Sequence, residues 1–168
     1  MAFGPQVGDV WVVATRHSEI ATLPISLRAK GVRYVDFKVG FDRDFVKELL
    51  RRIRRGSTTR DFEALRSPRD RVNDYEITRV ILRGRLRGRR DPCTITMDAH
   101  ARGRPEWCAS AGDIDTACPA SVVAQMLASG QIRRAGVFPP EDIVSAGLLF
   151  DALRRRKIKI IAKSECLD

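Results

Sequence analysis

The sequence lacks most of the signatures by which common enzyme classes are recognised. Its 168 residues include only two histidines and four cysteines, and aromatic residues make up 7% of the chain. No two cysteines are two or three residues apart, so neither a zinc ribbon nor a CxxC redox pair is present. The motifs GxGxxG, GxxxxGK[ST], HExxH and GxSxG are also missing. The chain by itself therefore does not resemble a complete cofactor-dependent enzyme.

Long apolar runs are missing as well. The longest uncharged apolar run, residues 10–14, is far shorter than a membrane span, and the first six residues do not form a secretory signal. Hydrophobic residues make up 43% and charged residues 31%, which is typical of a globular domain and excludes a disordered chain. We expect a cytoplasmic protein with no membrane partner, in which the four cysteines are reduced thiols, namely Cys93, Cys108, Cys118 and Cys166.

Acidic residues are too few in the middle of the chain to balance the basic ones. The formal net charge is +10 at pH 7, and residues 51–104 account for +9 of it, with sixteen basic and seven acidic side chains. A localised basic surface indicates an anionic partner, such as nucleic acid, phosphate or carboxylate. For the arginines at 51, 52, 54 and 55, the alternative is a solvated helix end, where the helix dipole favours cations.

Hydrophobic periodicity predicts the elements of the first third of the chain. Residues 10–15 and 31–40 are rich in β-branched and aromatic side chains and predict two strands. A helix is expected to begin after Asp42, which is a favourable N-cap, and to end before Gly56. Residues 57–73 are polar and predict a connecting loop.

The strongest pattern is that of a long β-hairpin with its turn at residues 87–91. Apolar and polar residues alternate along both arms, from Tyr75 to Leu86 and from Cys93 to Ala101. One face of this antiparallel pair is apolar, and the other is polar and basic.

The last third predicts a loop, two helices and a closing strand. The loop covers residues 102–115, and the first helix covers roughly 119–129. Ser145 is expected to cap the second helix, and residues 157–162 form the strand. The whole chain, residues 1–168, is thus predicted to be one α+β domain. Its sheet is largely antiparallel or mixed, with the helices on one face.

Part of this last third resembles a known family. Residues 115–130 read DTACPASVVAQMLASG and are followed by Gly136-Val137 and Pro140-Glu141. This run is similar to the C-terminal domain of saccharopine dehydrogenase-like oxidoreductases, the group of saccharopine reductases, lysine 6-dehydrogenases and carboxynorspermidine dehydrogenases. Residues 8–24, 31–41 and 150–156 are similar too, so that the resemblance covers most of the chain, and it is weakest at 56–74 and 102–113.

The resemblance implies a substrate-binding and dimerisation domain, related to the C-terminal domain of glyceraldehyde-3-phosphate dehydrogenase. In this reading the substrate is an amino acid or a polyamine-type amine or imine, and the protein is a homodimer joined through the sheet. NAD or NADP is bound by a Rossmann domain, in cis or in trans, whose glycine motif this sequence lacks. The domain is therefore expected to be inactive alone. One departure is Ala117, where the family has glycine after Thr116, and this side chain is expected to narrow the site.

Two residues on the polar face of the hairpin are candidates for acid/base chemistry. Asp98 and His100 lie two positions apart, and such a pair can protonate an imine or an amine. The alternative is a structural contact with Arg79 or Arg83 across the strands. These two arginines are themselves candidates for binding a substrate carboxylate, which a guanidinium holds through two parallel hydrogen bonds. They equally suit a sheet face that pairs with acidic groups of a partner subunit.

Thr116 and Glu19 complete the set of candidate substrate-binding residues. Thr116 is expected just before a helix N-terminus, where free N–H groups hold a carboxylate or phosphate, or where its hydroxyl is simply an N-cap. Glu19 follows the first strand beside His17, where it either takes part in proton transfer or makes a loop contact.

Two other functions fit the sequence. The basic middle third is consistent with a nucleic-acid-binding module, although no helix-turn-helix, RRM or OB pattern is present. The third alternative is a non-catalytic dimerisation protein, in which the polar sheet face is the interface.

Overall fold

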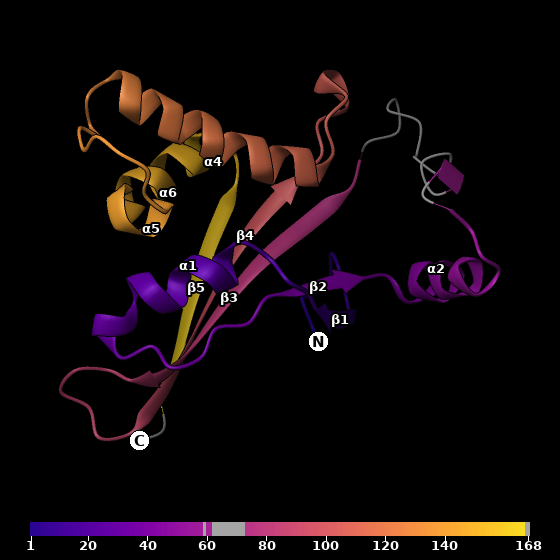
Figure 1. Ribbon diagram of the computed structural model, residues 1–168, viewed down its shortest axis with the longest axis horizontal. Helices are drawn as coiled ribbons and strands as arrows, with labels where there is room; N and C mark the ends of the chain where they lie inside the picture. Colours follow the sequence, from indigo (N-terminus) through magenta and orange to yellow (C-terminus); the bar gives the residue numbers. More distant parts are fainter. Residues whose placement is uncertain (59, 62–72, 167–168) are drawn as a thin grey trace. The chain divides into compact units, whose positions relative to one another are not determined.

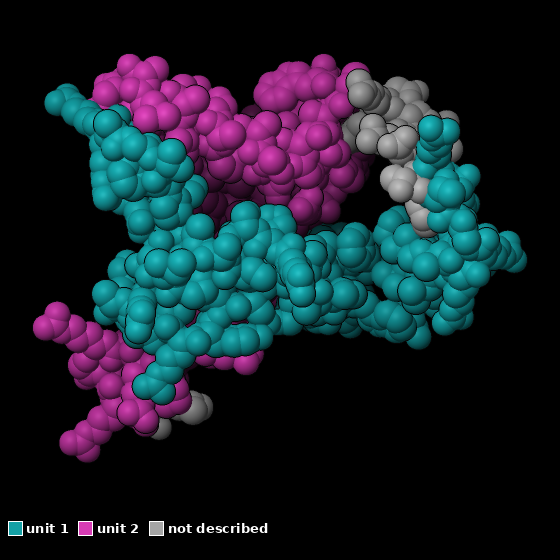
Figure 2. Space-filling view, in the orientation of Figure 1, with its two compact units in different colours: residues 1–67, 132–144 teal, residues 68–131, 145–168 magenta. Residues whose placement is uncertain are grey.

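The computed structural model describes residues 1–58, 60, 61 and 73–166 (Figure 1). The chain, for which we predicted one domain, divides into two compact units (Figure 2). Unit 1 comprises residues 1–67 and 132–144, and unit 2 comprises residues 68–131 and 145–168. Each unit is described by itself below. Most of the predicted loop at 57–73 lies outside the described residues.

Unit 1 contains a small two-stranded sheet and short helices. Strand β1 (Trp11–Ala14) pairs antiparallel with β2 (Lys38–Phe41), and helices α1 (Glu19–Ser26) and α5 (Pro140–Ile143) lie in contact. Between α1 and β2 lies a short 3₁₀ turn, η1 (Arg28–Lys30). The strand that we predicted over residues 31–40 was wrong in its bounds. The ladder begins only at Lys38 because β1 ends at Ala14, and beyond it the N–H of Thr15 donates to the carbonyl of Phe37 at 2.9 Å without a further ladder pair.

Helix α2 (Arg43–Arg54) begins and ends where the sequence predicts. The carboxylate of Asp42 accepts hydrogen bonds from the backbone N–H groups of Asp44 and Phe45, at 2.9 and 3.0 Å. Gly56, with φ of 76°, follows the helix in the left-handed conformation that glycine adopts without strain. The last turn of α2 is basic and contains Arg51, Arg52 and Arg54. The carboxylate of Glu48 accepts hydrogen bonds from Arg51 and Arg52.

Unit 2 is built on a three-stranded antiparallel sheet in the order β3-β4-β5 (Figure 1). Strands β3 (Tyr75–Arg85) and β4 (Pro92–Arg102) form the predicted hairpin, and β5 (Lys159–Cys166) returns along the other side of β4. The α+β fold class and the antiparallel sheet are thus confirmed.

One face of this sheet carries the helices. Helix α4 (Ala111–Ala128) packs on β4 and β3, and α6 (Ala146–Arg155) packs on β5 and on α4. Apolar side chains are buried in this unit, and a valine, leucine, isoleucine or methionine side chain contributes about 1.5–3 kcal/mol when fully removed from water. The buried apolar residues of this unit are Cys93, Ala101, Ala111, Ile114, Val122, Met126, Ala152, Leu153 and Ile158.

Helix α4 begins earlier than predicted. We expected a loop over residues 102–115 and a helix from Pro119, but only residues up to Ser110, including the 3₁₀ turn η3 (Pro105–Trp107), precede the helix. Ser110 and Asp113 form a capping box, with each side chain bonded to the other's backbone N–H. Pro119 lies inside the helix, where it removes one backbone hydrogen bond.

The cysteines are not all reduced, which corrects our expectation. Strand β5 extends to Cys166, four residues beyond the predicted end, and its register places Cys166 opposite Cys93, to which it is joined by a disulfide. Cys108 and Cys118 are free. The spacing in the sequence gave no hint of the bond, because strand register brings together residues that are 73 positions apart.

In the described part of the chain, none of the helices has the length and apolar character that crossing a bilayer requires.

Replacing Cys166 with Ser is expected to lower the free energy of unfolding by about 2–4 kcal/mol, because the bond closes a long loop and restricts the unfolded chain. Denaturant unfolding without reductant measures this loss, and reduction of the wild type is expected to reproduce it. Cys108→Ser, at an exposed free cysteine, is the matched control and is expected to leave stability unchanged. Four reactive thiols in the folded, unreduced protein would contradict the assignment.

Candidate functional site

The face of the sheet that α4 and α6 leave open is polar. Because side chains alternate along a strand, the register aligns three rows across β3, β4 and β5. These rows are Arg79–Asp98–Ile161, Ile81–Thr96–Lys163 and Arg83–Thr94–Glu165.

Arg79 and Asp98 form a two-bonded ion pair across β3 and β4. Nε of Arg79 donates to Oδ1 of Asp98 and a terminal guanidinium nitrogen donates to Oδ2, both at 2.7 Å. The two side chains are only 19% and 16% exposed, so the pair is largely withdrawn from solvent. The hydrogen bonds from Arg79 hold the pKa of Asp98 below its usual value. Asp98 is therefore an ionised partner of Arg79 at neutral pH, and the contact weighed as the alternative is present.

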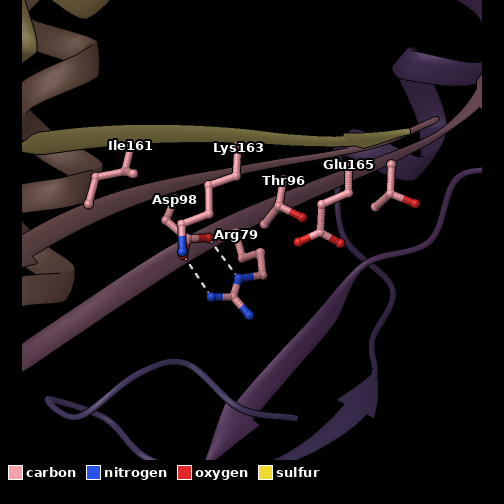
Figure 3. A pocket seen from close by; sticks show the side chains of 7 residues that line it. Arg79, Thr96, Asp98, Ile161, Lys163 and Glu165 are labelled. Atoms are coloured by element: carbon pink, nitrogen blue, oxygen red, sulfur yellow. Dashed lines mark hydrogen bonds and ion pairs between the residues drawn. The ribbon is translucent and has the colours of Figure 1, made fainter. Parts of the chain in front are cut away.

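A hollow of about 200 Å³ lies beside this pair (Figure 3). Lys163 and Glu165 project from β5 on the same side of the sheet as the Arg79–Asp98 pair (Figure 3). Neither Lys163 nor Glu165 makes a side-chain hydrogen bond or ion pair with a residue that the structure describes. The hollow therefore offers one ammonium and one carboxylate to a ligand. Its lining residues are Arg79, Thr94, Thr96, Asp98, Ile161, Lys163 and Glu165.

His100 lies on the same face but is not hydrogen-bonded to Asp98. Its Nδ1 atom is 2.9 Å from the hydroxyl of Tyr75, and the two rings meet edge to face. Its Nε2 atom is buried and has no partner among the described residues. The side chain of Asp98 is thus bonded to Arg79 and that of His100 to Tyr75, and the two are not bonded to each other. The catalytic role predicted for them stays a prediction.

The other predicted residues are spread over three elements. Arg83 is exposed near the end of β3, in the row that also holds Thr94 and Glu165. Thr116 lies within α4 and not before it, and its hydroxyl is 3.4 Å from the carboxylate of Asp115. Our expectation of free N–H groups beside Thr116 was therefore wrong, because the helix had already begun. Ala117 lies within the same helix, where alanine is favourable.

Glu19 belongs to unit 1, at the first turn of α1. Its carboxylate is hydrogen-bonded to the ring of His17 and accepts a bond from the hydroxyl of Ser18 at 3.1 Å. Partial burial acts to raise the pKa of Glu19, but these hydrogen bonds outweigh it, and the pKa lies below its usual value. The contact with His17 is a local one, with His17 stacked on Phe37 at a centroid distance of 4.1 Å.

Sequence reasoning missed a cluster of carboxylates on the opposite, helix-covered face. The hydroxyl of Thr78 donates to Asp115 of α4 at 3.0 Å, and the carboxylate of Glu76 lies so close to α4 that a Cβ added at Gly112 would be 3.0 Å from it. Loss of hydration, followed by the charge and hydrogen bond of Asp115, raises the pKa of Glu76 to about 7. The signal was present, since alternation puts Glu76 on the otherwise apolar face of the hairpin.

A dinucleotide does not fit the N-termini of α2 and α4, the two longest described helices. The first turn of α4 is occupied by the Ser110–Asp113 capping box, and the N–H of Ala111 donates to Asp74 at 2.9 Å. The first turn of α2 is capped by Asp42. A pyrophosphate is normally held by free N–H groups of a helix that follows a parallel strand, and both described sheets are antiparallel.

Comparisons with protein-family models, with curated proteins and with solved structures found no match to this chain.

Replacing Asp98 with Asn is expected to lower the free energy of unfolding at pH 7 by about 1–2 kcal/mol, because Arg79 loses its ionised partner. Since the pKa of Asp98 is depressed in the folded state, the contribution of the pair is present above about pH 4 and is lost as the pH falls further. Urea unfolding between pH 2.5 and 7 should show the wild type and the variant converging at the acid end. Asp151→Asn removes an exposed helical pair with Arg154 and, as control, is expected to change stability by less than about 0.5 kcal/mol.

Replacing Glu76 with Gln is expected to stabilise the fold at pH 8 and to change little at pH 4. The pKa of Glu76 is raised by folding, so its stabilising contribution is complete below about pH 4.3 and is lost as the pH rises through about 7. The urea midpoint of the wild type should therefore fall between pH 5 and 8 more than that of the variant. Equal pH dependence in the two proteins would refute the assignment, and Glu165→Gln on the open face serves as control.

Proposed function

We propose that the open face of the β3–β4–β5 sheet binds a small ligand carrying both a carboxylate and an amine, such as an amino acid. The observation that carries the proposal is the hollow beside the Arg79–Asp98 pair, which presents Lys163 and Glu165 together. The ammonium of Lys163 suits a ligand carboxylate, and the carboxylate of Glu165 suits a ligand amine.

The strand geometry supports a single small ligand. Lys163 and Glu165 are two residues apart on one face of β5, which separates their Cα atoms by about 6.6–6.8 Å. The hydroxyls of Thr94 and Thr96 lie on the neighbouring strand β4, in the same rows as Glu165 and Lys163, and offer both donors and acceptors. Arg83 shares the row of Thr94 and adds a second cation for a ligand carboxylate.

We further propose that this chain is the substrate-binding domain of a saccharopine dehydrogenase-like oxidoreductase acting on an amino acid or a polyamine-type amine or imine. This part of the proposal rests on the sequence resemblance. NAD or NADP would be held by a Rossmann domain in cis or in trans, because the N-termini of α2 and α4 are already capped and both described sheets are antiparallel. In this enzyme Asp98, kept ionised by Arg79, and His100 would orient the substrate and move its proton.

The cytoplasmic location belongs to this proposal as well, since the resembled oxidoreductases work on small metabolites. A disulfide such as Cys93–Cys166 is more typical of oxidising compartments. The thiol state of the protein in its source cells, fixed by rapid alkylation, decides between the two locations.

A second candidate function is nucleic-acid binding, and the exposed end of the hairpin favours it. Five arginines around the β3–β4 turn are exposed, and none of them forms an ion pair with another described residue. These arginines are Arg83, Arg85, Arg87, Arg89 and Arg90.

Calorimetric titration with L-lysine, L-glutamate and spermidine tests the first proposal. We expect at least one amino acid to bind, and Lys163→Met or Glu165→Gln to weaken it about tenfold, which corresponds to about 1.4 kcal/mol. Lys30→Met, an exposed lysine of unit 1, is the matched control.

Unchanged affinity in both site variants would overturn the assignment of the hollow. Affinity for mixed-sequence DNA that falls steeply with salt and is lost on replacing Arg87, Arg89 and Arg90 would instead establish the second candidate.

A further inference from the structure

Helix α2 is amphipathic, and its apolar face is exposed. On a helical projection with about 100° per residue, its apolar residues share an arc of about 140° that no polar side chain interrupts. Three of them, Phe45, Leu50 and Ile53, are 51%, 45% and 55% exposed, and no residue of this helix is buried among the described residues. A helix of a globular domain normally covers such a face, so this one is available to a partner. The apolar arc consists of Phe45, Val46, Leu49, Leu50 and Ile53.

Cations lie along both edges of the apolar arc. On the same projection, three of them lie beyond Leu50 and one lies beyond Phe45. Residues 43–55 contain six basic and two acidic side chains, which leaves a net charge of +4. Both acidic side chains are already ion-paired with cations of the helix itself. The charge complement of this face is therefore an anionic surface. The edge cations are Arg43, Lys47 and Arg54 on one side and Arg52 on the other.

The small sheet of unit 1 extends the apolar arc with aromatic rings. Trp11 of β1 is paired with Phe41 of β2, and the ring of Phe41 stacks on that of Phe45 at a centroid distance of 5.5 Å. Trp11 is 51% exposed, and the guanidinium of Arg43 lies over its ring, 5.2 Å from the centroid. Exposed tryptophan beside cations is typical of protein surfaces that lie at the boundary between lipid and water.

We propose that α2, together with Trp11 and Phe41, lies in the surface of an anionic phospholipid bilayer. The apolar arc enters the boundary between headgroups and acyl chains, to a depth of about 5–10 Å. The edge arginines and lysine keep their stems along this boundary and place their charges at the lipid phosphates. A helix in the interface needs no spanning length, so the lack of a long apolar run, from which we expected no membrane partner, does not bear on this surface.

Other partners match only part of this face. The phosphates of a nucleic acid bind the cations but leave the apolar arc in water. Two copies of α2 packed along the apolar arc set the edge that carries Arg43, Lys47 and Arg54 against itself or against the edge of Arg52, and like charges oppose both arrangements. An anionic bilayer supplies apolar and anionic groups to the same face. The inference is independent of which ligand the hollow of unit 2 binds.

Vesicle flotation with the full chain tests the proposal. We expect vesicles of phosphatidylcholine with about 30% phosphatidylglycerol to bind the wild type about tenfold or more tightly than vesicles of phosphatidylcholine alone. Ile53→Asp places a carboxylate inside the apolar arc and is expected to weaken this binding about tenfold or more. Val137→Asp is the matched control, because it makes the same change of charge at a fully exposed aliphatic residue of unit 1. It is expected to change binding by less than about twofold.

A second pair of variants tests the edge cations without placing charge in the apolar arc. Arg54→Gln removes one exposed edge cation and is expected to weaken binding to the anionic vesicles about fivefold. Arg33→Gln, at an exposed arginine of unit 1 outside α2, is the matched control and is expected to have less than about half that effect. Circular dichroism checks that every variant is folded.

The fluorescence of Trp11 reports whether this surface enters the lipid. The chain has two tryptophans, so Trp107→Phe leaves Trp11 as the reporter, and Trp11→Phe leaves Trp107 of unit 2 as the control. On addition of anionic vesicles, the emission of Trp11 is expected to shift to shorter wavelength and to be quenched by lipids with brominated acyl chains. The emission of Trp107 is expected to stay unchanged.

Three results would each overturn the proposal. The first is a wild type that binds neither kind of vesicle, which is the result expected if an acidic protein covers the apolar arc. The second is vesicle binding that survives Ile53→Asp but is lost on replacing Arg87, Arg89 and Arg90 of the hairpin turn. The third is quenching of Trp107 without quenching of Trp11.

Discussion

The position of β4 between two antiparallel neighbours is the constraint on which the arrangement of unit 2 depends. Because side chains alternate strictly, a single register assigns every residue of three strands to one of two faces. That register places Ala101 and Cys93 on the face that carries the helices, and it places Asp98 beside Arg79 on the open face. A slip of one residue would exchange the faces and destroy the buried layer and the polar row together.

On the two faces of this sheet, the pKa of a carboxyl group shifts in opposite directions. On the open face, the guanidinium of Arg79 lowers the pKa of Asp98, so this carboxylate keeps its charge where a ligand can approach. On the covered face, loss of hydration and the nearby carboxylate of Asp115 raise the pKa of Glu76 to about 7. The difference comes from what the neighbouring element supplies, since β3 supplies a guanidinium to Asp98, whereas α4 supplies a second carboxylate to Glu76.

Sequence patterns predicted the features that depend only on residues close together in the chain. Alternation placed both arms of the hairpin and its turn, and Asp42 and Gly56 placed the ends of α2, because these signals act within a few residues. The start of α4 was missed because Pro119 is favourable in a first helical turn, and the capping residues Ser110 and Asp113, nine and six positions earlier, were assigned to a loop. The Arg79–Asp98 contact followed from strand register. The disulfide and the hollow did not, because both depend on where β5 returns, which no neighbouring residue determines.

The Cys93–Cys166 bond also gives the chain a closed covalent circuit. The circuit runs through β4, α4, α5, α6 and β5, and it contains residues 132–144, which belong to unit 1. A protease that cuts the backbone once inside this circuit therefore releases no fragment, since the two new ends remain on one molecule through the sulfur atoms. The two units are therefore covalently linked at both ends of residues 132–144, in addition to the segment that joins residue 61 to residue 73. The part of unit 1 that comes from the second half of the chain, residues 132–144, leaves unit 2 after Gln131 and returns to it at Ser145, so that both of its ends are anchored.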